Sequence, residues 1–280
     1  MTKPLERVPV HGGELEYETR GEGDTVLLIH GSHIAGSFLP IMTEAGLANY
    51  RLIRYHRRGF AGSAPHGGAF SIEQQAADAL AVLRHLSVSR AHVVGHSYGG
   101  TTALQLALQA PDIAGTLVLL EPALLMVRSA ESFANEYVVP AVAKYQAGDA
   151  VRAVDIFGRG IGGPEWRAEV ARTVPGGPAQ AEDDARTFFE IELPALADWE
   201  FDTEMAAKIS QPILFVLGGE SAPMFQEGKE LVHAWLPQTE DLLVPGASHL
   251  LQMQTPRTVA EGVAGFLSRH PLPTEGSRSG

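Results

Sequence analysis

Short apolar runs of strand length alternate with segments of helical spacing along most of the chain. The runs around 115–120 (GTLVLL) and 212–217 (PILFVL) are continuously apolar, which is typical of central parallel strands covered on both faces. This alternation predicts an α/β fold with a mostly parallel sheet and crossover helices. After a hairpin-like stretch around 14–20, we expect strands at 25–30, 50–55, 91–95, 115–120, 212–217 and 241–244.

Helical spacing separates these strands. The clearest helix is predicted over 71–86, where Ser71 and Gln74 are placed to form a capping box at its start. The closing helix has Thr255 at its cap and Pro256 in its first turn, a position that proline favours. Further helices are expected at 37–49, 99–110 and 255–268.

The stretch 124–209 has helical spacing without a convincing buried strand. Glycine and proline breaks at 158–164 and 175–178 divide it into several helices. It is therefore predicted to be an insertion between two strands of a core formed by 1–123 and 210–270, with 271–280 as a flexible tail.

The amino-acid composition argues against several classes of function for this protein. Among 280 residues, the formal net charge of −12 and the absence of a basic cluster argue against nucleic-acid binding. The absence of cysteine excludes disulfides, thiolate catalysis and thiolate metal sites. No apolar run reaches the roughly 18 residues of a membrane span, and the first residues lack a secretory core, so a cytoplasmic protein is expected.

The segment GHSYGG at 95–100 places Ser97 between an apolar strand and a helix. A sharp turn between strand and helix gives the GxSxG pattern its catalytic meaning, with glycines where side chains would strike neighbouring elements. The alternative is a helix-capping serine beside packing glycines. The flanking elements favour a nucleophile.

A serine hydroxyl needs an imidazole within hydrogen-bond reach, because it is a weak nucleophile near neutral pH. Of eleven histidines, His249 in VPGASHLLQM is the one that follows the last predicted strand. Its alternative is a solvent-facing loop histidine. Since a helix follows it, we expect His249 to be the catalytic base.

Four motifs occur in one order along the chain: HGS at 30–32, RRGFAGS at 57–63, GHSYGG at 95–100 and PGASH at 245–249. The chain resembles the α/β hydrolases in these motifs. The resemblance implies an α/β hydrolase fold, no required cofactor or metal, and an oxyanion hole formed by the backbone amides of Ser32 and Tyr98. His30 is expected to hold the oxyanion loop.

The triad acid departs from the family pattern. The usual position after PILFVL reads GGESAP at 218–223, where Asp is missing and Glu220 stands one residue early. Some members of the family carry the acid one strand earlier, where this chain has Glu121 in the apolar run VLLEPALLMV. A carboxylate there needs a partner, and His249 is the candidate. We assign Glu121 as the acid, with Glu220 as its rival and a structural carboxylate as the third possibility.

The resemblance also implies that 124–209 forms a helical cap over an apolar pocket. We predict Trp166, Phe188 and Phe189 of the cap, together with His30 and Gly31, as substrate-binding residues. The alternative is that the aromatic rings only hold the cap helices together. Glu190 and Glu192, in FFEIELPAL, could present a carboxylate to the site, but a helix or turn rich in acids is usually a solvated face, which is the expectation for both.

The resulting hypothesis is a serine hydrolase that acts on a carboxylic ester or lactone of a small apolar molecule. Cleavage of a carbon–carbon bond in a diketone-like substrate and a cofactor-free perhydrolase activity are alternatives within the same fold. A non-catalytic protein that binds a small ligand is the alternative of another class. We expect no nucleic-acid or membrane partner and leave a homodimer open.

Overall fold

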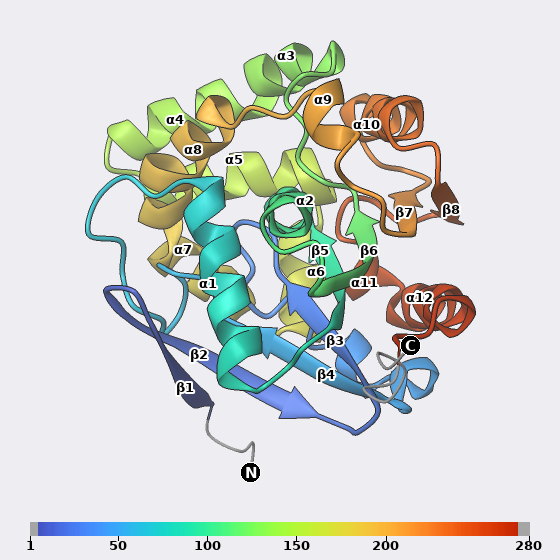
Figure 1. The fold of residues 1–280 in the computed structure, drawn as a ribbon. Helices are drawn as coiled ribbons and strands as arrows, with labels where there is room; N and C mark the ends of the chain where they lie inside the picture. The colour runs from blue at the N-terminus through green and yellow to red at the C-terminus, as the bar shows by residue number, and fades with distance from the viewer. Residues whose placement is uncertain (1–4, 274–280) are drawn as a thin grey trace.

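An eight-stranded sheet forms the centre of the molecule in the computed structural model, which describes residues 5–273 (Figure 1). The strand order is β1-β2-β4-β3-β5-β6-β7-β8, with the first three strands antiparallel and the other neighbours parallel. The predicted α/β hydrolase architecture is confirmed. The strands are β1 (Glu6–Val10), β2 (Gly13–Arg20), β3 (Asp24–Ile29), β4 (Tyr50–Tyr55), β5 (Ala91–His96), β6 (Ala114–Leu120), β7 (Ile213–Gly218) and β8 (Thr239–Val244).

Helices cover both faces of this sheet because successive strand residues point to opposite sides. In β3, Leu27 joins the core beneath α1, α2 and α10, whereas Leu28 joins the core beneath α12. Figure 1 shows α1 and α2 on the near face of the sheet. The helices are α1 (Ile72–His85), α2 (Tyr98–Gln109), α10 (Pro223–Trp235), α11 (Leu251–Gln254) and α12 (Pro256–Arg269).

The start of α1 follows the predicted capping box. The Ser71 hydroxyl accepts a hydrogen bond from the Gln74 amide at 3.4 Å, and the Ser71 amide donates to the Gln74 side chain at 2.8 Å. Thr255 also stands at the start of α12, but its hydroxyl donates backward to the Leu251 carbonyl at 3.0 Å rather than capping the helix.

The helix expected over 37–49 is wrong. The segment instead holds two short 3₁₀ turns, Ile41–Thr43 and Ala45–Leu47, separated by an extended Glu44. The bend brings Gly46 against α12, where an added Cβ would lie 3.2 Å from the Ala260 backbone. We attribute the absence of a continuous helix to this close backbone contact with α12.

Between β6 and β7 the chain is helical throughout, and these helices gather beyond the ends of β5 and β6 (Figure 1). The first predicted break comes too early, because Gly158 lies inside α5, where its missing Cβ leaves room for the Trp166 ring. The elements are α3 (Ser129–Phe133), the π-helical turn η3 (Ala134–Val138), α4 (Val139–Gln146), α5 (Ala150–Gly162), α6 (Trp166–Thr173), α7 (Gly177–Asp183), the π-helical turn η4 (Thr187–Glu192), α8 (Leu193–Asp198) and α9 (Thr203–Ala206).

Most of the tail expected at 271–280 lies outside the described residues, which end at residue 273. Just before that end, the Leu272 amide donates to the Asp24 carboxylate at 3.4 Å. None of the helices within residues 5–273 combines the length and the apolar character that crossing a membrane requires.

Candidate active site

Ser97 occupies a strained turn between β5 and α2, with φ 52° and ψ −120°. Such a backbone costs about 1–3 kcal/mol and persists only where the surroundings impose it. Here Gly95 and Gly99 let the turn close: a Cβ on Gly95 would lie 2.2 Å from the Gly99 carbonyl oxygen, and one on Gly99 would lie 2.1 Å from the Ile29 carbonyl oxygen. The turn therefore holds the serine side chain clear of both elements.

Glu121 follows β6 directly, has a positive φ of 46° and is fully buried. Its Oε2 lies 2.5 Å from Nδ1 of His249, and its Oε1 accepts a hydrogen bond from the Gly218 amide at 2.6 Å. Both carboxylate oxygens are therefore occupied. Because a carboxylate can only accept, Nδ1 of His249 carries the proton and Nε2 is free to accept one.

Two aromatic rings hold the His249 imidazole in place. Phe225 of α10 stacks on it with ring centres 4.0 Å apart, and His96 packs at 4.6 Å on a tilted ring. Nε2 of His96 also donates to the His249 carbonyl at 2.8 Å. Burial, together with the neighbouring His249, keeps the pKa of His96 well below its usual range, so His96 stays neutral.

Ser97 and His249 line one cavity of about 70 Å³ beneath the helices of the insertion, residues 124–209. The Ser97 hydroxyl, half-buried on the cavity wall, makes no hydrogen bond to another described residue. Most of the wall is apolar. The other lining residues are Ser32, Tyr98, Ala123, Leu125, Ala130, Phe133, Ala134, Val138, Phe157, Ile161, Phe188, Glu192, Leu193, Leu196, Met224 and Phe225.

The backbone amides of Ser32 and Tyr98, both residues of this wall, have no protein acceptor within the described chain. Tyr98 is the first residue of α2, so its amide points out of the positive end of a helix of 12 residues. Free N–H groups at a helix start favour an anion, and both amides belong to residues beside Ser97 in the cavity.

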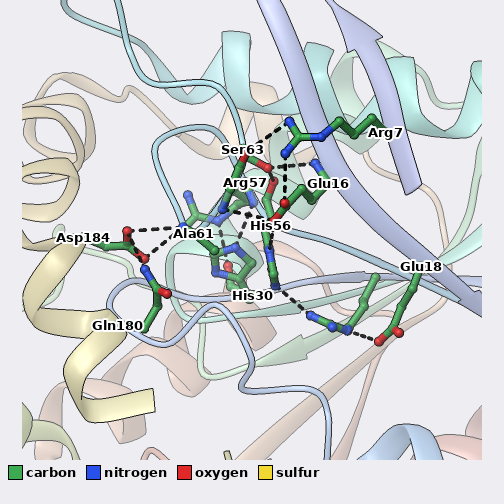
Figure 2. Close-up of polar contacts among 12 residues, drawn as sticks. Arg7, Glu16, Glu18, His30, His56, Arg57, Ala61, Ser63, Gln180 and Asp184 are labelled. Atoms are coloured by element: carbon green, nitrogen blue, oxygen red, sulfur yellow. Dashed lines mark hydrogen bonds and ion pairs between the residues drawn. The ribbon is translucent and has the colours of Figure 1, made fainter. Parts of the chain in front are cut away.

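A buried arginine fixes the loop that carries Ser32. Arg57 donates from Nε to the His30 carbonyl at 2.8 Å, and its own amide donates to Nε2 of His30 at 2.9 Å (Figure 2). Its Nη2 donates to the Gly31 carbonyl at 3.0 Å. The guanidinium also lies 4.6 Å from the centre of the Tyr98 ring. Arg57 therefore contacts both the loop that carries the Ser32 amide and the side chain of Tyr98.

His56 continues this network toward the sheet surface (Figure 2). Its Nε2 accepts from Arg54 at 2.9 Å, and its Nδ1 donates to Glu16 at 3.0 Å. Burial, helped by Arg54, lowers the pKa of His56, which favours the neutral ring that can do both. The histidine after β4 thus has a structural role that the sequence alone did not reveal.

The alpha/beta hydrolase family model matches residues 26–262, which is most of the chain. The chain belongs to the alpha/beta hydrolase family. The sn-1-specific diacylglycerol lipase ABHD11 of Mus musculus is 25% identical over 224 residues, 74% of this chain and 68% of that protein. An esterase from Thermogutta terrifontis has a similar structure, with a TM-score of 0.78 and 22% identity, covering 96% of this chain and all of that one. The enol-lactonase from Burkholderia xenovorans has a TM-score of 0.77 and 21% identity, covering 94% and 100% of the two chains.

Of the residues expected to bind substrate in this hydrolase, the structure brings Phe188 to the cavity. His30 and Gly31 lie behind the wall, held by Arg57. Trp166 is buried within the insertion, where its Nε1 donates to Asp155 at 3.2 Å. His30, Gly31 and Trp166 therefore contact other parts of the protein and do not line the cavity.

Phe189 also points away from the cavity. Its ring stacks on Tyr145 with centres 4.7 Å apart, at a separate surface hollow. Adjacent side chains on a helix point in different directions, and Phe188 is the one of this pair that lines the cavity. The aromatic pair therefore divides between the cavity and the outer packing of the insertion.

The structure distinguishes the two candidates for the triad acid, Glu121 and Glu220. Glu220 is exposed and does not touch the cavity that holds His249, whereas Glu121 lies against His249. The expected solvated face is correct for Glu190, which is exposed, and wrong for Glu192, which is fully buried on the cavity wall. Within residues 5–273, no group of three His, Asp or Glu side chains is arranged to hold a metal ion.

Proposed function

We propose that this protein is a serine hydrolase that cleaves a carboxylic ester or lactone of a small apolar molecule and requires no cofactor. One observation carries the proposal: a serine on a strained turn and a histidine paired with a buried carboxylate line the same cavity.

In the proposed reaction the Ser97 hydroxyl attacks the carbonyl carbon of the ester while Nε2 of His249 takes its proton. The carbonyl π electrons move onto the oxygen, which becomes an oxyanion. When this intermediate collapses, the bond to the leaving alkoxide breaks and His249 returns the proton to it. Water then attacks the acyl-serine by the same steps, and the carboxylic acid leaves.

Glu121 has the role of stabilising and orienting the protonated ring. Because Gly218 fixes one of its oxygens, the other can only face Nδ1 of His249. The negative charge then balances the imidazolium that forms in each proton transfer.

The amides of Ser32 and Tyr98 are proposed to bind the oxyanion. Loss of one such donor typically costs about 3–4 kcal/mol of transition-state stabilisation. Arg57 has a positioning role here, because it holds the carbonyls of His30 and Gly31 and packs on the Tyr98 ring.

The substrate class follows from the cavity wall. Phe133, Phe157 and Phe188 are contributed by the insertion, which we propose acts as a cap, and Phe225 comes from the core. A cavity of about 70 Å³ lined by such groups fits a short apolar acyl chain, with cap movement admitting the remainder. The esterase, lactonase and lipase among the similar proteins support ester or lactone chemistry.

Hydrolysis of p-nitrophenyl butyrate, a γ-lactone and a linear diketone tests the proposal. We expect turnover of the ester or the lactone, lost at least about 1,000-fold in Ser97→Ala. Ser132→Ala is the matched control, because Ser132 is an exposed serine of α3, and it should retain native activity. Turnover of the diketone alone would replace the ester proposal with carbon–carbon cleavage.

A further inference from the structure

Glu192 is a buried carboxylate inside the same cavity that the proposed reaction does not use. It ends the turn η4 of the insertion, has no exposed surface and lines the cavity together with Ser32 and Ser97. Its Oε1 accepts a hydrogen bond from Nη1 of Arg57, whereas its Oε2 is buried without a hydrogen-bond partner.

The neighbouring protein donors leave this oxygen unsatisfied: the Ser32 hydroxyl lies near the carboxylate and opposes the rise that burial causes in the pKa of Glu192, but Oε2 has no hydrogen-bond partner among the described residues. Each of the other two side-chain nitrogens of Arg57 already has an acceptor, Nε the His30 carbonyl and Nη2 the Gly31 carbonyl. The remaining neighbours on the wall of the cap, such as Leu193, are apolar. An unsatisfied buried acceptor costs about 1–3 kcal/mol, so one on a residue that lines a binding cavity indicates a ligand donor.

The charge state of the pair restricts what that donor can be. Burial raises the pKa of Glu192, while the Arg57 guanidinium and the Ser32 hydroxyl oppose this rise. With Arg57 alongside, the pair carries no net charge, so a cationic ligand group would lose its hydration without a net attraction. A neutral hydroxyl or amide N–H fits the site.

We propose that Glu192 is a specificity-determining residue whose free oxygen accepts a hydrogen bond from a hydroxyl or amide N–H on the acyl part of the substrate. This inference rests on the proposed ester hydrolysis. The acyl part is indicated because Glu192 shares the wall with Ser32, whose amide would bind the acyl oxygen. Hydrogen bonds to charged groups contribute about 1.5–3 kcal/mol, which corresponds to a preference of roughly 10- to 150-fold.

Three p-nitrophenyl esters test this directly: butyrate, 3-hydroxybutyrate as both enantiomers, and 3-methoxybutyrate. The methoxy ester keeps the oxygen and its inductive effect but removes the donor. Each kcat/KM is divided by the rate constant for hydroxide-catalysed hydrolysis of the same ester, which removes differences in intrinsic reactivity. We expect this ratio to be about 10-fold or more higher for one 3-hydroxybutyrate enantiomer than for butyrate or 3-methoxybutyrate. Equal values for all of them would overturn the inference.

The variant Glu192→Gln gives a second measurement. Its amide oxygen must face Nη1 of Arg57, which leaves the NH₂ group where Oε2 was. We expect the advantage of the hydroxy ester over the methoxy ester to fall about 10-fold, since a methoxy oxygen can now accept. A purely structural Glu192 would lower all rates alike and leave this ratio unchanged.

Glu190→Gln is the matched control, because Glu190 belongs to the same turn but is exposed and pairs with Arg186. It should keep the native preference. If Glu192→Gln does not fold, the comparison of esters in the native enzyme still decides the question. Hydrolysis of butyrate without a hydroxyl preference refutes this inference alone, whereas no hydrolysis of any ester or lactone refutes the proposed function as well.

Discussion

Replacement of Glu121 by glutamine should remove most of the activity without removing the fold. The Gly218 amide donates to Oε1 of Glu121, so the glutamine carbonyl must occupy that position and its NH₂ group must face His249. Nδ1 of His249 then has to accept a hydrogen bond, and the ring proton moves to Nε2. The imidazole can no longer accept the proton of Ser97.

The size of the loss follows from the charge and the tautomer. A carboxylate and an imidazolium with charge centres about 4 Å apart attract each other by roughly 4 kcal/mol at an effective dielectric constant near 20. A loss of this attraction corresponds to about a 1,000-fold lower rate. In a Ser-His-Asp triad, an amide in place of the acid reverses the histidine tautomer and lowers kcat by about 10,000-fold. We therefore expect kcat for p-nitrophenyl butyrate to fall about 1,000- to 10,000-fold.

The assay is steady-state hydrolysis at pH 7.5, with urea unfolding to show that each variant is folded. Glu220→Gln is the matched control, since Glu220 is an exposed glutamate near the end of the neighbouring strand β7. It should have native kcat. A folded Glu121→Gln enzyme within tenfold of native kcat, or a dead Glu220→Gln enzyme, would refute the reasoning.

Three further predictions concern stability. Arg57→Met leaves the buried Glu192 unpaired and should cost about 3–5 kcal/mol in urea unfolding. Addition of Glu192→Leu should restore part of this loss, since the His30 and Gly31 carbonyls still lack their donor; equal stability of the single and double variants would contradict the account. Burial raises the pKa of Asp184 to about 6, above its unfolded value, so the native stability it contributes at low pH is lost as the pH rises through 6. Relative to Asp184→Asn, the native protein should therefore become less stable between pH 4 and pH 7, and a constant difference would contradict this. Gly99→Ala drives a Cβ into the Ile29 carbonyl and should lower both melting temperature and kcat, while Gly67→Ala, with open space around it, should change neither.

Much of the fold was predictable because strong local signals agree with the tertiary structure. The strand at 50–55 has the predicted bounds, and the capping box at Ser71 starts α1 as expected. The helix expected at 37–49 failed for a tertiary reason, the contact of Gly46 with the α12 backbone. Local spacing carries no information about that partner.

The candidate site shows the same division. The position of Glu121 at the end of a central strand predicted its place beside His249, because the ends of neighbouring parallel strands meet at one edge of the sheet. For Glu192 the sequence favoured the solvated face over the site, because its acidic neighbours are typical of a solvated turn and its partner Arg57 lies 135 residues away. Trp166 was wrongly predicted to line the cavity for a similar reason. Its buried position depends on the hydrogen bond to Asp155 and on the space that Gly158 leaves.

The central claim is that the Ser97 hydroxyl is activated by His249 and forms a covalent acyl intermediate. Peptide mapping by mass spectrometry after treatment with an alkyl fluorophosphonate tests it most directly. The account predicts one phosphonyl group on Ser97, none on Ser97→Ala, and labelling slowed by at least about 100-fold in Glu121→Gln. A folded native protein that stays unlabelled, or that carries the label on another residue, would contradict it.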